Sequence, residues 1–129
     1  MSRKFIALGA LLAATAVALG AFGAHGLKKI VDDSTVQTFQ TGVQYQFYHA
    51  LAVILIGLLY EKKSSKLILY SGWFFISGIV LFSGSLYILT LLKATETTGL
   101  NKLGLITPFG GISFISGWVC LFVSYWRKK

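Results

Sequence analysis

The stretch LILYSGWFFISGIVLFSGSLYILTLL, Leu67–Leu92, decides the fold, because it carries no charged side chain over its whole length. At about 1.5 Å per residue, a helix of this length is longer than the roughly 30 Å hydrocarbon core of a bilayer is thick. An uncharged apolar stretch of about 18 residues or more is typical of a transmembrane helix. We therefore expect residues 67–92 to span a membrane.

Three further apolar stretches have the length of a span: residues 5–27, 43–60 and 103–126. The first also has the pattern of a signal peptide, with basic residues before an apolar run. It is longer than a typical signal core, however, and three more spans follow it. The sequence therefore predicts a single all-α integral membrane domain over residues 1–129, folded as a four-transmembrane-helix bundle.

The composition agrees with a protein that lies in lipid. Of the 129 residues, 55% are hydrophobic and 12% are charged, whereas about a quarter of a soluble domain is charged. The net charge of +8 would suggest nucleic acid in a soluble protein, but here most Lys and Arg residues border the apolar stretches. In that position they anchor spans and set topology, so the expected partner is the lipid bilayer and not nucleic acid.

The distribution of basic residues predicts the orientation of the chain. With four spans, both termini and the second loop share one side of the membrane. That side holds Arg3, Lys4, Lys62, Lys63, Lys66, Arg127, Lys128 and Lys129. The opposite side holds Lys28, Lys29, Lys93 and Lys102. Because the cytoplasmic side is the more basic one, we expect a multi-pass protein of the cell membrane with cytoplasmic N- and C-termini.

The segment between the first two spans has the signature of a helix start. Ser34-Thr35-Val36-Gln37 matches the S-x-x-Q pattern of a capping box, and apolar residues then recur at helical spacing. Asp32 and Asp33 would favour the helix N-terminus by their negative charge. These features predict a short amphipathic interfacial helix between spans one and two, either separate from span two or continuous with it.

Polar side chains gather in one half of the predicted bundle, the half remote from both termini, which we name the distal half. Span order alone places them there. The candidate polar cluster consists of His25, Gln44, Tyr45, Tyr48, His49, Ser83, Ser85 and Thr107. Gln44 and Tyr48, like Tyr45 and His49, are four residues apart and share a helix face. Because polar groups are costly in lipid, we expect the cluster to face the bundle interior.

Two interpretations of this cluster remain open. It could bind a small polar molecule or a lipid headgroup, or pass a proton through a histidine. It could equally be an internal hydrogen-bond network that holds the bundle together.

Pro108 suits the first turn of a helix, and Thr107 would then cap that helix. The string Phe75-Ile76-Ser77-Gly78 recurs as Phe114-Ile115-Ser116-Gly117. Chance or shared packing chemistry explains this four-residue match better than an internal repeat of the chain.

Enzyme signatures are missing from the sequence. The four acidic residues lie in predicted loops, and no Ser-His-Asp arrangement has an interpretable spacing. Cys120 is the single cysteine, and no zinc-like spacing accompanies it. We therefore expect no catalytic residue, metal or cofactor, and a non-enzymatic accessory or structural component of the cell membrane, in a homo-oligomer or a larger membrane complex. The alternative is a small oligomeric transporter, channel, or lipid or small-molecule binder that uses the polar cluster.

Four motifs, in chain order, resemble the YgdD/YwdK-type family of small multi-pass membrane proteins. They are GAFGAHGL at residues 20–27, QYQFYHA at 44–50, LFSGSLY at 81–87 and ITPFGG at 106–111. The resemblance covers most of the chain. It implies a membrane protein of about four spans without a settled biochemical activity, and it transfers no catalytic residue.

Overall fold

The computed structural model describes residues 1–97 and 101–127, and these residues form helices with no strand among them. Lys128 and Lys129, which the topology prediction counts, lie outside these ranges. The elements are α1 (Ser2–Ala24), η1 (Leu27–Lys29), α2 (Asp33–Lys62), α3 (Lys66–Gly78), η2 (Ile79–Ser83), α4 (Gly84–Ala94), η3 (Asn101–Leu105) and α5 (Thr107–Trp126). The predicted all-helical, four-span fold class is confirmed.

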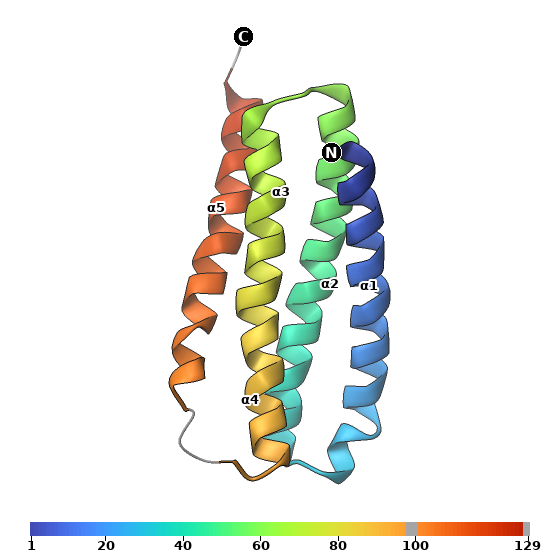
Figure 1. The fold of residues 1–129 in the computed structure, drawn as a ribbon, viewed down its shortest axis with the longest axis vertical. Coiled ribbons are helices and arrows are strands. Elements are labelled where there is room, and N and C mark those ends of the chain that lie inside the picture. Colours follow the sequence, from blue (N-terminus) through green and yellow to red (C-terminus); the bar gives the residue numbers. More distant parts are fainter. Residues whose placement is uncertain (98–100, 128–129) are drawn as a thin grey trace.

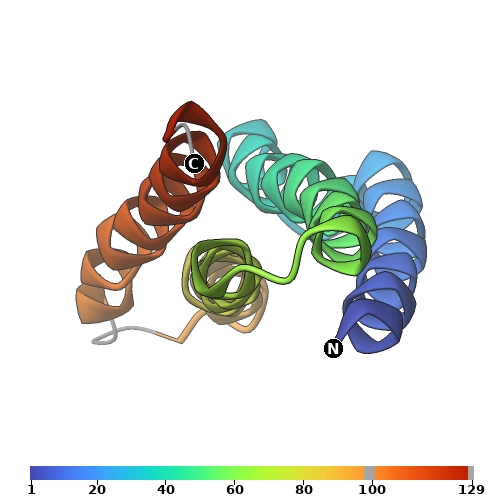
Figure 2. The same ribbon diagram turned by 90° about the horizontal axis from the view of Figure 1, so that it is seen from above.

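Four helical columns are long and apolar enough to cross a membrane: Ser2–Lys29, Asp33–Lys62, Lys66–Ala94 and Lys102–Trp126. They lie side by side and alternate in direction, so that both chain ends are at the same end of the bundle (Figure 1). The third column contains α3 and α4, joined by one π-helical segment, η2. Seen from above, α1 packs on α2, whereas α5 lies beyond α3 and apart from α1 (Figure 2).

Helix α2 begins at the loop that carries the predicted interfacial helix. The cap is Asp32, two residues before the expected Ser34: its carboxylate accepts hydrogen bonds from the Thr35 N–H, at 2.9 Å, and from the Thr35 hydroxyl. The capping-box prediction was therefore wrong in its residue. The bonds from Thr35 hold the pKa of the Asp32 carboxyl below its usual value. The amphipathic segment forms the first turns of α2 itself, so the continuous form of the two predicted alternatives is correct.

Helix α5 begins at Thr107 with Pro108 in its first turn, as predicted. Thr107 does not cap the helix, because Ile106 occupies the cap position and makes no side-chain hydrogen bond there. The Thr107 hydroxyl instead bonds to Ser85 of α4. Thr107 therefore contributes to the site through a partner on a neighbouring helix.

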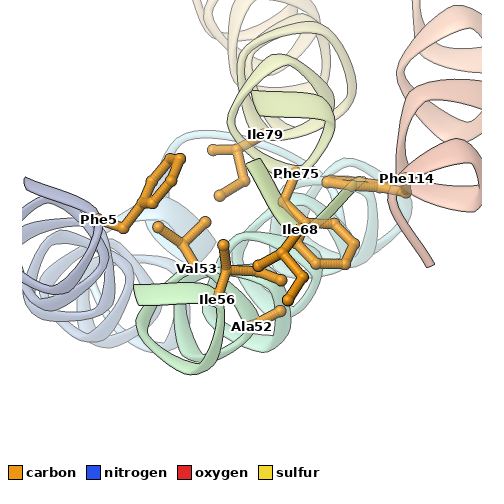
Figure 3. Packing of buried hydrophobic residues seen from close by; sticks show 8 residues of the cluster. All are labelled: Phe5, Ala52, Val53, Ile56, Ile68, Phe75, Ile79 and Phe114. Carbon is orange, nitrogen blue, oxygen red and sulfur yellow. The ribbon is translucent and has the colours of Figure 1, made fainter. Parts of the chain in front are cut away.

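The apolar core is an interlocked set of side chains from α1, α2, α3, η2 and α5 (Figure 3). Its members are Phe5, Ala52, Val53, Ile56, Ile68, Phe75, Ile79 and Phe114. Lipid tails are as apolar as these side chains, so helix association in a membrane depends on close packing more than on burial from water. The core therefore shows where the helices fit together.

The repeated Phe-Ile-Ser-Gly string explains how α3 and α5 fit. The Phe75 ring covers Gly117, where an added Cβ would lie 2.7 Å from the ring, and the Phe114 ring covers Gly78 in the same way. Each copy of the string thus supplies the phenylalanine that fills the space above the other copy's glycine. Shared packing chemistry is the correct interpretation of the repeat.

Candidate functional site

The best-connected polar residue in the distal half is Gln46 of α2, which is 4% exposed. Its Nε2 donates to the Leu12 carbonyl and to Thr15 Oγ1 of α1, both at 2.9 Å. Its Oε1 accepts a hydrogen bond from the Tyr87 hydroxyl of α4 at 2.7 Å. One amide therefore joins three helices and uses both of its ends.

Span order places Gln46 and Tyr87 in the distal half as well, but neither was among the eight residues of the candidate polar cluster. A signal for Gln46 was present in the sequence, because it lies at helical spacing from the apolar positions Phe39, Val43 and Ala50. All four residues are buried in the structure. Tracing that apolar face along α2 would have placed Gln46 toward the interior and Gln44 away from it.

Ser83 lies in the π-helical segment η2 and is completely buried. Its hydroxyl donates to the Gly42 carbonyl of α2 at 2.6 Å. A Cβ at residue 42 would lie 3.0 Å from the Tyr87 ring, so the glycine allows the ring to approach α2. Single π turns inside α-helices are frequent at functional sites, but here the segment's one serine is engaged in a cross-helix bond.

Ser85 and Thr107 form a second polar pair at the distal end. The Ser85 hydroxyl donates to the Phe82 carbonyl at 2.8 Å and lies 2.6 Å from Thr107 Oγ1. Because a hydroxyl has one hydrogen to donate, Thr107 is the donor and Ser85 the acceptor between them. This bond links α4 to the start of α5.

His49 of α2 is buried between aromatic rings. It stacks on Phe114 with ring centroids 3.6 Å apart and an interplanar angle of 12°. The Trp118 indole N–H, which can only donate, reaches His49 Nε2 at 3.0 Å. Nε2 therefore accepts, and Nδ1–H donates to the Tyr45 carbonyl at 2.8 Å. Both ring nitrogens of the neutral imidazole are used within the protein.

The remaining predicted residues do not join the interior network. Gln44, Tyr45 and Tyr48 are exposed on the surface of α2, although the Tyr45 ring also packs on Phe82. His25 is exposed at the end of α1, where Nδ1 bonds to the Ala21 carbonyl of its own helix at 2.9 Å. The expectation that the whole cluster faces inward was wrong for these four residues.

The buried polar side chains all have partners within the protein. Within residues 1–97 and 102–127, every buried side-chain nitrogen or oxygen has at least one hydrogen-bond partner. In the same part of the chain, no three His, Cys, Asp or Glu side chains are grouped so that they could hold a metal ion. The hydrogen bonds of the interior side chains therefore link neighbouring helices.

Comparison with known proteins identifies the family of this chain. The model described as "Protein of unknown function (DUF423)" matches residues 19–111, which include the distal polar residues. The chain belongs to this family. Its family resemblance, predicted from the four motifs, is confirmed.

Several similar proteins carry the name UPF0382 membrane protein. YwdK of Bacillus subtilis is 47% identical, with 95% of each chain covered. A protein of Staphylococcus aureus, SAB0533, is 43% identical over 97% of each chain, and one of Staphylococcus epidermidis is 44% identical over 95% of this chain and 94% of its own. No solved structure gives a significant match. This chain is a multi-pass membrane protein of a family of unknown function.

Proposed function

We propose that this protein has a non-enzymatic, accessory or structural role in the cell membrane. The observation that carries the proposal is that every buried polar side-chain atom in the described residues is already hydrogen-bonded within the bundle. A site that binds or transforms a polar substrate needs donors or acceptors free to meet it. The interior amide, hydroxyl and imidazole groups instead hold helices together. This role is compatible with the family description and the relatives' names, which state no activity.

The alternative, a transporter or channel through the distal polar residues, has weaker support. A path for a polar solute would pass Gln46, Ser83 and His49, and each of these side chains is bonded to a neighbouring residue. Opening such a path would break several of these bonds in a low-dielectric interior, where unpaired polar groups are costly.

The proposal is tested by measuring ligands, flux and partners on the intact protein. We expect native mass spectrometry from mild detergent to show no stoichiometric small polar ligand. Proteoliposomes should conduct protons and small solutes no faster than empty liposomes, and in-cell cross-linking should capture a membrane-protein partner or a second copy. A retained polar ligand, or a flux that disappears in Gln46→Leu but not in Gly111→Ala, would overturn the proposal.

We also propose that both termini face the cytoplasm. The start of α1 and the end of α5 lie at one end of the bundle (Figure 1). Of the ten Lys and Arg residues that the structure describes, six are at that end, which supports this orientation by the positive-inside rule. Fusions that report the side of the membrane test it. A C-terminal green fluorescent protein should fluoresce and a C-terminal alkaline phosphatase should be inactive. The reverse pattern would overturn the orientation.

A further inference from the structure

A line of side chains runs along α2 on a face that the rest of the bundle leaves uncovered. Gln44, Tyr48, Leu51, Leu55 and Leu58 are exposed, and Thr41, one step before them, is half-buried. We name these six residues the α2 stripe. Their steps alternate between three and four residues, which gives the average of about 3.5 at which two helices pack along a left-handed seam.

Gln44 lies at the depth of the middle of α1. It lines one groove together with Ala16 and Val17 of α1, which are near the centre of the uncharged stretch 5–27. At about 1.5 Å per residue, those two residues are roughly 15 Å from either end of that stretch. Gln44 is therefore level with the hydrocarbon region that α1 crosses, although the apolar part of α2 starts only at about residue 43.

The Gln44 amide has no hydrogen bond to any other residue that the structure describes. Two neighbours on the same helix contrast with it: Gln40 Nε2 donates to the Gly20 carbonyl at 3.1 Å, and Gln46 Nε2 donates to the Leu12 carbonyl at 2.9 Å. An exposed amide at this depth faces lipid tails, which neither donate nor accept hydrogen bonds. Polar groups in that position are costly unless a protein partner supplies the bonds.

A shallow groove lies beside Gln44 and Tyr48, between α1 and α2, with a volume of about 260 Å³. On the α1 side it is lined by Ala16, Val17 and Gly20. Small side chains at a lipid-facing surface let another helix approach closely. The polar part of the α2 stripe is therefore also the part with space for a side chain from outside.

We propose that two copies of this chain pair through the α2 stripe, with their Gln44 amides hydrogen-bonded to each other. Copies inserted in the same orientation have parallel α2 helices, so a two-fold axis along the membrane normal brings each stripe residue opposite its own copy. A glutamine amide both donates and accepts, so two such amides can bond reciprocally. The leucines continue the contact toward the other membrane surface, and Tyr48 of each copy is next to its partner's groove.

Cysteine cross-linking in native membranes tests the contact without changing Gln44. In a Cys120→Ser background, Tyr48→Cys, Leu51→Cys and Leu55→Cys should each give a disulfide-linked dimer on mild oxidation. Ser77→Cys and Trp73→Cys place the thiol on exposed positions of α3 and should give little or none. Absence of dimer at the stripe, or equal cross-linking at the α3 positions, would overturn the proposal.

The role of Gln44 is tested by energy transfer between labelled copies diluted in liposomes. Gln44→Leu should weaken the dimer about tenfold, because two interhelical hydrogen bonds are lost. Gln44→Asn, which keeps an amide, should weaken it less, and Ser77→Leu should leave it unchanged. A Gln44→Leu dimer as tight as the wild type would overturn the amide pairing, and occupation by lipid alone would appear as monomers at every dilution. A monomer would leave the accessory role proposed above intact, since that role rests on the interior network.

Discussion

Helices α1 and α2 are joined by hydrogen bonds whose donors all come from α2. Gln40 reaches the Gly20 carbonyl, and Gln46 reaches Leu12 and Thr15. The α1 side supplies the acceptors and small residues against which α2 packs. This seam therefore depends on a few long amide side chains, and above all on Gln46, which also accepts from a third helix.

Helices α3 and α5 each donate one serine bond to the other instead. Ser71 of α3 donates to the Gly117 carbonyl of α5, and Ser113 of α5 donates to the Phe74 carbonyl of α3, each at 2.7 Å. The phenylalanine-on-glycine contacts are reciprocal as well. Two antiparallel helices with the same four-residue string thus form a seam whose ring-on-glycine contacts are reciprocal, with a serine bond in each direction. The comparison shows that one bundle satisfies its polar groups both by a central hub and by a repeated, distributed contact.

The largest effect is expected where a side chain would meet backbone. A Cβ at Gly110 of α5 would lie 2.7 Å from the Phe82 Cα of η2, and backbone cannot move aside as a side chain can. Gly110→Ala should therefore force α5 away and destabilise the fold by about 3 kcal/mol, at the upper end for overpacking. Thermal melting in detergent measures this.

The matched control for that substitution is the next residue. A Cβ at Gly111 would meet nothing within 4 Å, so Gly111→Ala should leave the melting temperature unchanged or slightly raise it through better helix propensity. Equal destabilisation by both substitutions would show that the α5 contact with η2 is not as close as described.

The second largest effect is expected at Gln46, whose amide joins three helices. Gln46→Leu removes bonds to Leu12, Thr15 and Tyr87 and leaves the hydroxyl of the half-buried Tyr87 without this acceptor. We expect a loss of about 2 kcal/mol. Tyr87→Phe should cost about 1 kcal/mol, and the double variant should cost less than the sum because both share one bond. Strictly additive losses in the free energy of reversible unfolding would contradict the hydrogen bond between Gln46 and Tyr87.

A smaller pair of effects is expected in the seam between α3 and α5. Ser71→Ala and Ser113→Ala each remove one hydroxyl-to-carbonyl bond, worth about 0.6 kcal/mol on average in a membrane. Ser71→Ala should cost more, because Ser71 is completely buried and Ser113 is half-buried. The two losses should add in the double variant, since the serines share no partner. A larger loss for Ser113→Ala than for Ser71→Ala in the same unfolding measurement would contradict this order.

The smallest effect is expected at the exposed start of α2. The pKa of Asp32 is lowered by its bonds from Thr35, so its ionised form stabilises the fold above the usual carboxyl pKa, and this stabilisation is lost as the pH falls through the lowered pKa. Asp32→Ala should therefore lower the melting temperature slightly at neutral pH and not at all once the carboxyl is protonated. A difference that grows toward acid would contradict this sign.

The candidate site was only partly predictable. Span order placed His49, Ser83, Ser85 and Thr107 in the distal half, and all four make interior or cross-helix bonds. It could not separate Gln44 from Gln46, because two residues along a helix amount to a turn of about 200°. Depth follows from position along the chain, whereas facing depends on how each helix is rotated about its own axis.

What the sequence by itself determined is the solvent and the class: four uncharged apolar stretches of sufficient length require helices in lipid, since lipid leaves backbone groups no other partner. The four family motifs could also be recognised in the sequence, because each is a contiguous string of residues. Only the tertiary structure decided which polar groups are shared between helices, which glycines lie under rings, and which face of α2 remains open. Those outcomes depend on how close each pair of helices can come, and that distance is set by side chains far apart in the sequence.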